Sequence, residues 1–117
     1  MYHNNLNNVD RKIRVGALIK ELAAAFIRQE ANTDPMITVT NVDLSPDFKR
    51  AFILVTTIPD GREEDALIFL KRSATDLRNY LKQKANLKRI PHLEFMIDFG
   101  ERHRQNMDEL VKEIDGK

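Results

Sequence analysis

Two neighbouring stretches of the sequence, residues 36–44 and 50–58, constrain most strongly what this chain can fold into. They read MITVTNVDL and RAFILVTTI, and their β-branched and aromatic residues favour extended strands. The residues SPDFK between them include Ser, Pro and Asp, which are typical of turns. We therefore expect an antiparallel β-hairpin in the middle of the chain. The apolar residues of the first stretch change parity between Val39 and Val42, so a β-bulge is predicted near Asn41.

A helix is predicted before the hairpin, from about Asp10 to Glu30. Asp10 is expected to cap the N-terminus of this helix, and Pro35 disfavours the helical conformation for Asp34. The apolar residues of this region recur at helical spacing, and they are Val15, Leu18, Ile19, Leu22, Ala25 and Phe26.

A second helical pattern and a third strand follow the hairpin. The acidic stretch REEDA at 62–66 suits the positive end of a helix dipole, and Pro91 is expected to end the helical region. Between them, apolar residues spaced three and four apart are Leu67, Leu70, Ala74, Leu77 and Leu81. The alternation in HLEFMIDF then predicts a strand with Leu93, Phe95, Ile97 and Phe99 on one face. A chain of 117 residues with this order is one α+β domain, a three-stranded sheet with helices packed on one face.

The second strand is apolar on both of its faces. Phe52 and Leu54 are expected to lie with Met96 on the face that the main helices do not cover. Either a partner protein or the chain's own C-terminal tail would cover that face. The tail, residues 101–117, follows a domain predicted for residues 9–100. Its apolar stripe of Met107, Leu110, Val111 and Ile114 is expected either to dock as a short amphipathic helix or to stay mobile.

Ser73, Thr75 and Asp76 interrupt the second helical pattern with residue types that favour helix caps over helix interiors. The apolar spacing continues across this point, so one continuous helix is an alternative. The run Ser-Ala-Thr-Asp matches a capping pattern, and we expect a kink at which one helix ends and another begins. The start of a helix presents free backbone amides and the positive end of a dipole, which suits a phosphate group.

Charge is distributed unevenly, although the net charge of the chain is only +1. Residues 71–91 carry seven basic and one acidic side chain, or +6, which leaves −5 for the rest of the chain. Such a separation usually directs a positive surface at an anionic partner. The alternative is a lysine-rich helix face that is merely solvated.

Four stretches of this sequence together resemble the ribosome-binding factor A family, bacterial assembly factors of the small ribosomal subunit. They are RVGALIKELAAAFIRQE, DP at 34–35, VTNVDLSPDFKRAFILV and LKRIPHLEFMID. The third resembles the family's Val-x-x-Val run, its Ser-x-Asp turn and a strand that begins with Ala51. The last resembles its Leu-Arg-x-x-Pro-x-Leu-x-Phe motif and ends at Asp98. The resemblance covers roughly residues 10–100 and implies a type II KH-like fold with the order α-β-β-α-kink-α-β.

The resemblance also locates the interrupted helix. In that family a short motif, typically Ala-x-Gly, stands where ordinary KH domains carry a Gly-x-x-Gly loop, and it falls here on Ser73-Ala74-Thr75. Ser and Thr replace the family's Ala and Gly, so the backbone can approach a phosphate less closely. Asp76 adds repulsion at the same place.

As a function, the resemblance implies a non-enzymatic factor that binds the small ribosomal subunit and its ribosomal RNA during late maturation and pre-rRNA processing. Other assembly factors or GTPases are further expected partners, and we expect a cytoplasmic monomer without a cofactor. Phosphate contacts would position the protein, and the shape of the folded RNA would provide specificity. The predicted RNA-binding residues are Arg11, Lys12, Arg14, Lys71, Arg72, Ser73, Ala74, Thr75, Arg78, Lys82, Lys84, Lys88 and Arg89.

Two other classes of function were weighed. A protein-interaction module would use the apolar face that contains Phe52, Leu54 and Met96. An enzyme is not predicted, because the three histidines lack metal-ligand spacing and there is no cysteine for thiol chemistry. No apolar run is long enough to cross a bilayer, and the first ten residues lack the features of a signal peptide.

Overall fold

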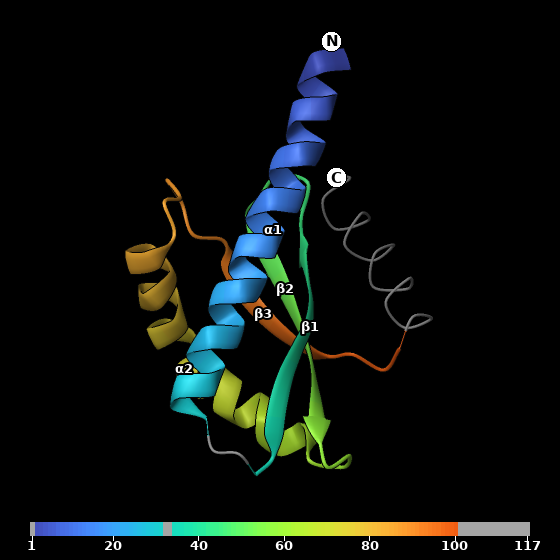
Figure 1. Ribbon diagram of the computed structural model, residues 1–117, viewed down its shortest axis with the longest axis vertical. Coiled ribbons are helices and arrows are strands. Elements are labelled where there is room, and N and C mark those ends of the chain that lie inside the picture. Colours follow the sequence, from blue (N-terminus) through green and yellow to red (C-terminus); the bar gives the residue numbers. More distant parts are fainter. Residues whose placement is uncertain (1, 32–33, 101–117) are drawn as a thin grey trace.

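The computed structural model describes residues 2–31 and 34–100 as an α+β fold, which confirms the predicted class. Figure 1 shows the two helices and the three strands of this part of the chain. The elements are α1 Tyr2–Glu30, β1 Met36–Leu44, β2 Arg50–Ile58, α2 Glu63–Lys84 and β3 His92–Ile97. The predicted tail at 101–117 and its helix lie outside the described residues.

The sheet has the strand order β1-β2-β3. β1 and β2 pair antiparallel, which confirms the predicted hairpin, and β2 and β3 pair parallel. Parallel strands need a crossover connection, and α2 supplies it. The pairing of β1 with β2 shifts between Val39 and Asn41, as the change of parity predicted. This bulge places the apolar residues of both halves of β1 on the same face of the sheet.

Both helices pack on one face of the sheet. Its core combines Ile19 and Phe26 of α1 with Leu77 and Leu81 of α2 over Ile53 of β2, and all five are buried. Phe52 and Leu54 form a separate cluster with Met96 on the opposite face, as predicted. The second face is therefore apolar as well.

Three predicted boundaries are wrong. α1 begins at Tyr2 and not at Asp10, because no proline or glycine precedes Asp10 and helix growth is cooperative once started. α2 ends at Lys84, well before Pro91, and Ala85 is already extended with φ −99° and ψ 136°. β3 ends at Ile97, so Phe99 does not share the face of the other apolar residues of the strand and is 72 % exposed.

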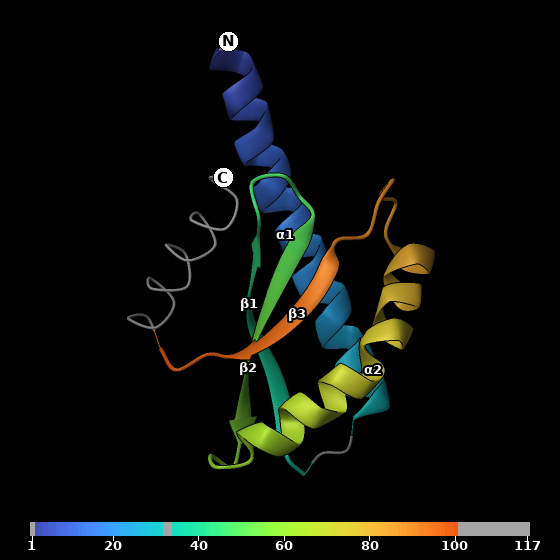
Figure 2. The ribbon, with the colours of Figure 1, turned by 180° about the vertical axis from the view of Figure 1, so that it is seen from behind.

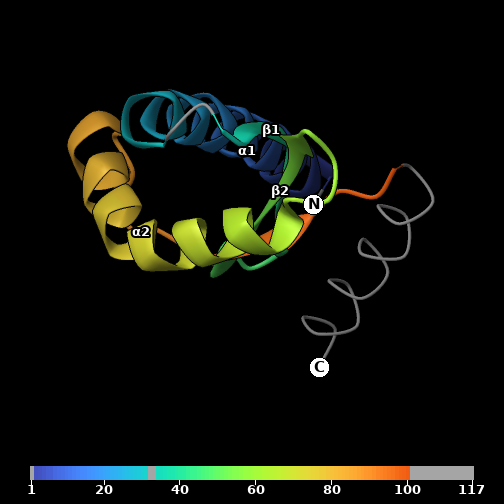
Figure 3. The same ribbon diagram turned by 90° about the horizontal axis from the view of Figure 1, so that it is seen from below.

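The interruption predicted in the middle of α2 is a bend and not a break. The helix runs without a gap from Glu63 to Lys84. Its ribbon changes direction where the colour passes from yellow to gold (Figures 2 and 3). Leu70 and Leu77 are buried on either side of the bend, so one continuous apolar face holds both halves against the sheet. Ser73 and Thr75 lie inside the helix, and the predicted second helix start, with its free amides, does not form.

Candidate nucleic-acid interface

The turn between β1 and β2 is held by a network of short hydrogen bonds. The buried Ser45 hydroxyl donates to Asp47 Oδ1 (2.8 Å), and the Lys49 amide donates to the same oxygen (3.0 Å). The Arg50 amide donates to Ser45 Oγ at 2.9 Å. The bonds from the Lys49 amide and then from the Ser45 hydroxyl lower the pKa of the Asp47 carboxyl below its ordinary value. This network holds Phe48 in a left-handed conformation with φ 63°.

Phe48 connects this turn with α1. The Arg11 guanidinium carbon lies 5.3 Å from the centre of the Phe48 ring, within the range of a cation–π contact. A shallow pocket of about 100 Å³ beside this contact is lined by residues of α1, of the turn and of the loop before β3, including Lys88 and Arg89. Three exposed cations, Arg11, Lys88 and Arg89, line this pocket with Phe48, and the exposed Lys49 follows Phe48 in the turn; we call these four cations the basic end. The turn adds one carboxylate, that of Asp47, so these five side chains together carry a net charge of +3.

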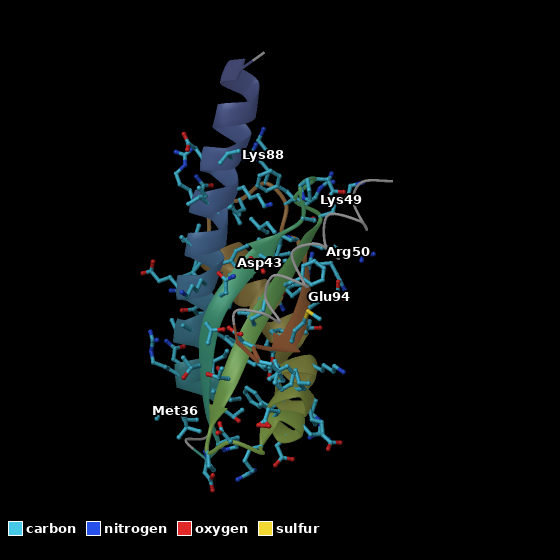
Figure 4. All side chains as sticks on the ribbon, turned by 90° about the vertical axis from the view of Figure 1, so that its right-hand side faces the viewer. Met36, Asp43, Lys49, Arg50, Lys88 and Glu94 are labelled. Atoms are coloured by element: carbon cyan, nitrogen blue, oxygen red, sulfur yellow. The ribbon has the colours of Figure 1, made fainter. Side chains whose placement is uncertain are left out.

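The loop that carries Lys88 and Arg89 is anchored from both sides. Arg78 of α2 donates from one guanidinium nitrogen to the Pro91 carbonyl (2.8 Å) and the Ile90 carbonyl (3.3 Å). The backbone beyond the loop is tied to the turn, since the His92 amide donates to the Lys49 carbonyl at 2.8 Å. These contacts place Lys88 at the same end of the molecule as Lys49 (Figure 4).

Arg78 therefore has a structural role that the sequence did not indicate. We expect Arg78→Met to lower the free energy of unfolding by about 1–3 kcal/mol, because two carbonyls of buried residues lose their hydrogen bonds. Urea unfolding followed by circular dichroism measures the change. The control is Lys82→Met on the same helix, which removes an exposed cation and should change stability by less than about 0.5 kcal/mol. Equal losses in the two variants would contradict the anchoring role.

The other predicted residues of α2 do not form one stripe. Lys71, Arg72 and Lys82 are exposed, whereas Ser73 and Ala74 are half-buried. Thr75 is also exposed, but it lies inside the continuous helix. Lys84 lies 6.0 Å from the ring centre of Tyr80, which packs against Phe26 of α1 at 5.6 Å between ring centres. Lys84 is thus on the side of α2 that faces α1, whereas Arg78 points toward the loop before β3.

The three predicted cations of α1 are also divided. Arg11 belongs to the basic end, and Arg14 is exposed one turn further along the helix. Lys12 instead lines a groove of about 550 Å³ between α1 and β1, together with Lys20 and the exposed Ile13. The predicted set is therefore spread over more than one surface, and only Arg11, Lys88 and Arg89 are brought together around a common pocket.

Within the described part of the chain none of these cations lies in an ion pair with a carboxylate, although the charge of Lys49 helps to lower the pKa of Asp47. The ion pairs found there join Arg50 to Glu94 and Arg62 to Asp34 and Asp65. A positive surface whose charges are unpaired and exposed retains its attraction for anions. Arg11, Lys88 and Arg89 of the basic end meet this condition.

Sequence reasoning missed Phe48 and Lys49. Both lie in SPDFK, which indicated only a turn, although an aromatic and a basic side chain at the tip of a hairpin could have been taken as a signal. The described residues contain no group of three potential metal ligands. They also include no helix that is both long and apolar enough to span a membrane.

Comparison with known proteins identifies relatives over most of the chain. The profile of the family described as ribosome-binding factor A matches residues 11–111. Ribosome-binding factor A of Nitrosococcus oceani is 39% identical over 119 residues, which cover 92% of this chain and 91% of that protein. The protein of the same name from Rhodopseudomonas palustris strain HaA2 is 32% identical over 107 residues, or 87% of this chain and 79% of its own length.

Solved structures agree with this assignment. The crystal structure of ribosome-binding factor A from Thermus thermophilus is similar with a TM-score of 0.66 and 28% identity, and the match covers 74% of this chain and 93% of that one. A homology model of the T. thermophilus factor, fitted into a cryo-EM map of its complex with the 30S subunit, has a TM-score of 0.61 and 29% identity, with 69% and 88% of the two chains covered. The fold is therefore KH-like, as the resemblance implied. By sequence and by structure, the chain belongs to the ribosome-binding factor A family.

Proposed function

We propose that this protein is a non-enzymatic assembly factor that binds the small ribosomal subunit and its RNA during late maturation, when the precursor RNA is processed. Membership of the ribosome-binding factor A family supports the proposal, as does the relative fitted on a 30S subunit. The observation in this chain that carries it is the basic end, four exposed cations from three segments, of which Arg11, Lys88 and Arg89 line one pocket with Phe48. We further propose that it acts as a monomer in the cytoplasm, alongside other assembly factors or GTPases on the particle.

The chemistry of the basic end suits the backbone of folded RNA. The Phe48 ring supports the Arg11 guanidinium from one side, so its N–H groups can donate to phosphate oxygens. Lys88 and Arg89 project from an anchored loop, which lowers the entropy that is lost when they bind. Contacts of this kind position a protein on RNA without reading its sequence. Discrimination would then come from the shape of the folded RNA.

The exposed cations along α2 would extend this contact. Lys71, Arg72 and Lys82 face solvent on the helix that leads to the anchored loop. We propose them as a second line of phosphate contacts, weaker than the basic end because no pocket or aromatic residue groups them. The bend would contribute to RNA binding at the place of the family's Ala-x-Gly motif. It contains the half-buried Ser73 and Ala74 and the exposed Thr75.

Sedimentation of the tagged protein from cells tests the assembly role. We expect the protein to migrate with free small subunits and to be absent from translating ribosomes, because an assembly factor leaves the particle before translation. A wash in high salt should release it, since phosphate contacts are screened by competing ions. The proposal would be contradicted if the protein migrated with translating ribosomes, or if all of it stayed at the top of the gradient as free protein.

A further inference from the structure

The face of the sheet opposite the helices is buried at one end only. Leu54 has 0% and Phe52 5% of its surface exposed, and together with Met96 they form what we call the outer apolar face. At the other end of the same face, Ile58 is 62% and Met36 49% exposed. In Figure 2, α1 lies behind the sheet, and the core residues of both helices pack on the other face.

The neighbouring strands do not account for this burial. In the register of the sheet, Leu54 lies between Asn41 and Met96, and Phe52 lies between Asp43 and Glu94. Neighbours in adjacent strands stand beside a side chain, since side chains are roughly perpendicular to the sheet, and they leave its outer end accessible. A cover above Leu54 and Phe52 is required, and neither described helix supplies it.

We propose that residues 101–117 form an amphipathic helix that packs on the outer apolar face and is its permanent cover. Met107, Leu110, Val111 and Ile114 are spaced as i, i+3, i+4 and i+7, so a helix would place them in one apolar stripe. Such a helix would be about 25 Å long, at about 1.5 Å per residue. Three strands at about 4.8 Å spacing span about 10 Å, so the helix is long enough to cross the face.

The chain leaves β3 at the level of the outer apolar face. Ile97, the last residue of β3, pairs with Val55, directly beside Leu54. The next residue, Asp98, donates from its amide to the Val55 carbonyl (2.8 Å) and accepts from Thr40 Oγ1 of β1 (2.6 Å). This contact reaches across β2, and Figure 1 shows the orange-red segment after β3 passing beyond β1.

Gly100 then adopts φ 117°, a turn that other residues rarely make, and its amide donates to Asp98 Oδ1 at 2.9 Å. By the register of the sheet, β3 ends one residue past the level of Leu54 and three residues before the level of Met36, which pairs with Ile58.

Charge supports the same occupant. Asp43 and Glu94 lie on either side of Phe52 on this face, and Glu94 is also paired with Arg50 of β2. Residues 101–117 begin with Glu101, which is followed by the cations Arg102 and Arg104. The acids Asp108, Glu109 and Glu113 fall outside the apolar stripe and would face solvent. The inference is independent of the proposed function, and it removes this face as a docking site for a partner protein.

A spin label on the predicted outer side of the tail tests the inference in the full chain. The natural sequence has no cysteine, so Glu109→Cys gives a single site for a nitroxide. We expect the label to broaden the methyl resonances of Leu54 and Met96 more than those of Leu70 and Leu81 in the core beneath the helices. A matched label at Lys71→Cys on α2 should reverse this order, because Lys71 lies on the helix side of the sheet. Equal broadening of both methyl sets by the Glu109→Cys label would overturn the inference.

Two further samples identify the occupant. Leu110→Asp together with Val111→Asp in the labelled chain should restore the Leu54 and Met96 signals, since charged residues would replace the centre of the stripe. Persistent selective broadening would show that the stripe is not what docks.

The second sample mixes two chains. One carries the spin label at natural isotope abundance, and the other is isotope-labelled but carries no spin label. The isotope-labelled chain should show no broadening. Broadening in that mixture would assign the cover to a second copy of the chain and contradict docking within one molecule.

Discussion

Replacing Lys88 and Arg89 together by glutamate is expected to weaken binding to purified small ribosomal subunits by about 100-fold. Each side chain would lose one charge-assisted contact with phosphate, which we set at about tenfold, near the lower end of the range for hydrogen bonds to charged groups. The loop itself should keep its conformation, because the Arg78 bonds that anchor it are made to backbone carbonyls beyond the two mutated positions.

Salt dependence provides a second and independent readout of this variant. If each residue contacts one phosphate, the slope of log affinity against log salt should become shallower by about 1.4–1.8, for about 0.7–0.9 per contact. Fluorescence titration of the labelled protein at several salt concentrations measures both the affinity and the slope. A weaker affinity with an unchanged slope would mean that the two residues do not contact phosphate.

The matched control carries the same change of charge elsewhere on the surface. Lys20→Glu with Arg28→Glu reverses two exposed cations of α1 that lie outside the basic end. We expect this double variant to keep most of its affinity and its salt slope, because only long-range attraction is altered and salt screens it. If the two double variants lose affinity equally, a localised interface at the basic end is ruled out.

Leu81→Ala is expected to cause the largest loss of stability, about 2–5 kcal/mol in the free energy of unfolding. Leu81 has none of its surface exposed and lies in the core between α2, α1 and the sheet. Removing its side chain leaves a cavity, because the surrounding core can relax only in part. A domain of this size is stabilised by only about 5–15 kcal/mol in total. A substantial fraction of the variant molecules would therefore be unfolded at moderate urea concentrations.

The adjacent residue provides the control for this prediction. Lys82 is exposed, and Lys82→Ala should change stability by no more than about 0.5 kcal/mol. Urea unfolding of both variants, followed by circular dichroism, compares the two midpoints directly. A loss at Leu81 no greater than that at Lys82 would show that the second half of α2 does not pack on the sheet. The anchored loop would then have no firm support on that side.

Patterns that depend on near neighbours in the chain were predicted correctly from sequence. The hairpin, the bulge between Val39 and Asn41 and the two apolar faces of β2 follow from the alternation of side chains along a strand. This alternation has a period of two residues, so a shift of one residue is visible without knowledge of the fold. The apolar face of α2 was predicted for the same reason, through the helical period.

Boundaries were predicted less well because they depend on what an element packs against. Nothing local distinguishes Asp10 in the interior of α1 from a cap residue. The end of α2 at Lys84 reflects tertiary packing, because Leu87 and Ile90 contact the core from an extended loop. The bend without a break has the same origin, since the buried face is continuous although Ser73 and Thr75 favour caps.

By itself, the sequence determined the order of the elements, the faces they bury and the excess of positive charge between residues 71 and 91. The tertiary structure alone decided which of those charges lie together. Arg11, Phe48 and Lys88 come from three separate segments. A backbone hydrogen bond ties the end of the loop to the turn, and a cation–π contact joins Arg11 to Phe48. The spacing of apolar residues along the sequence indicates which nearby residues share a face of a helix or strand. A surface built from distant segments depends instead on how those helices and strands pack together. Only the folded chain brings them to one place.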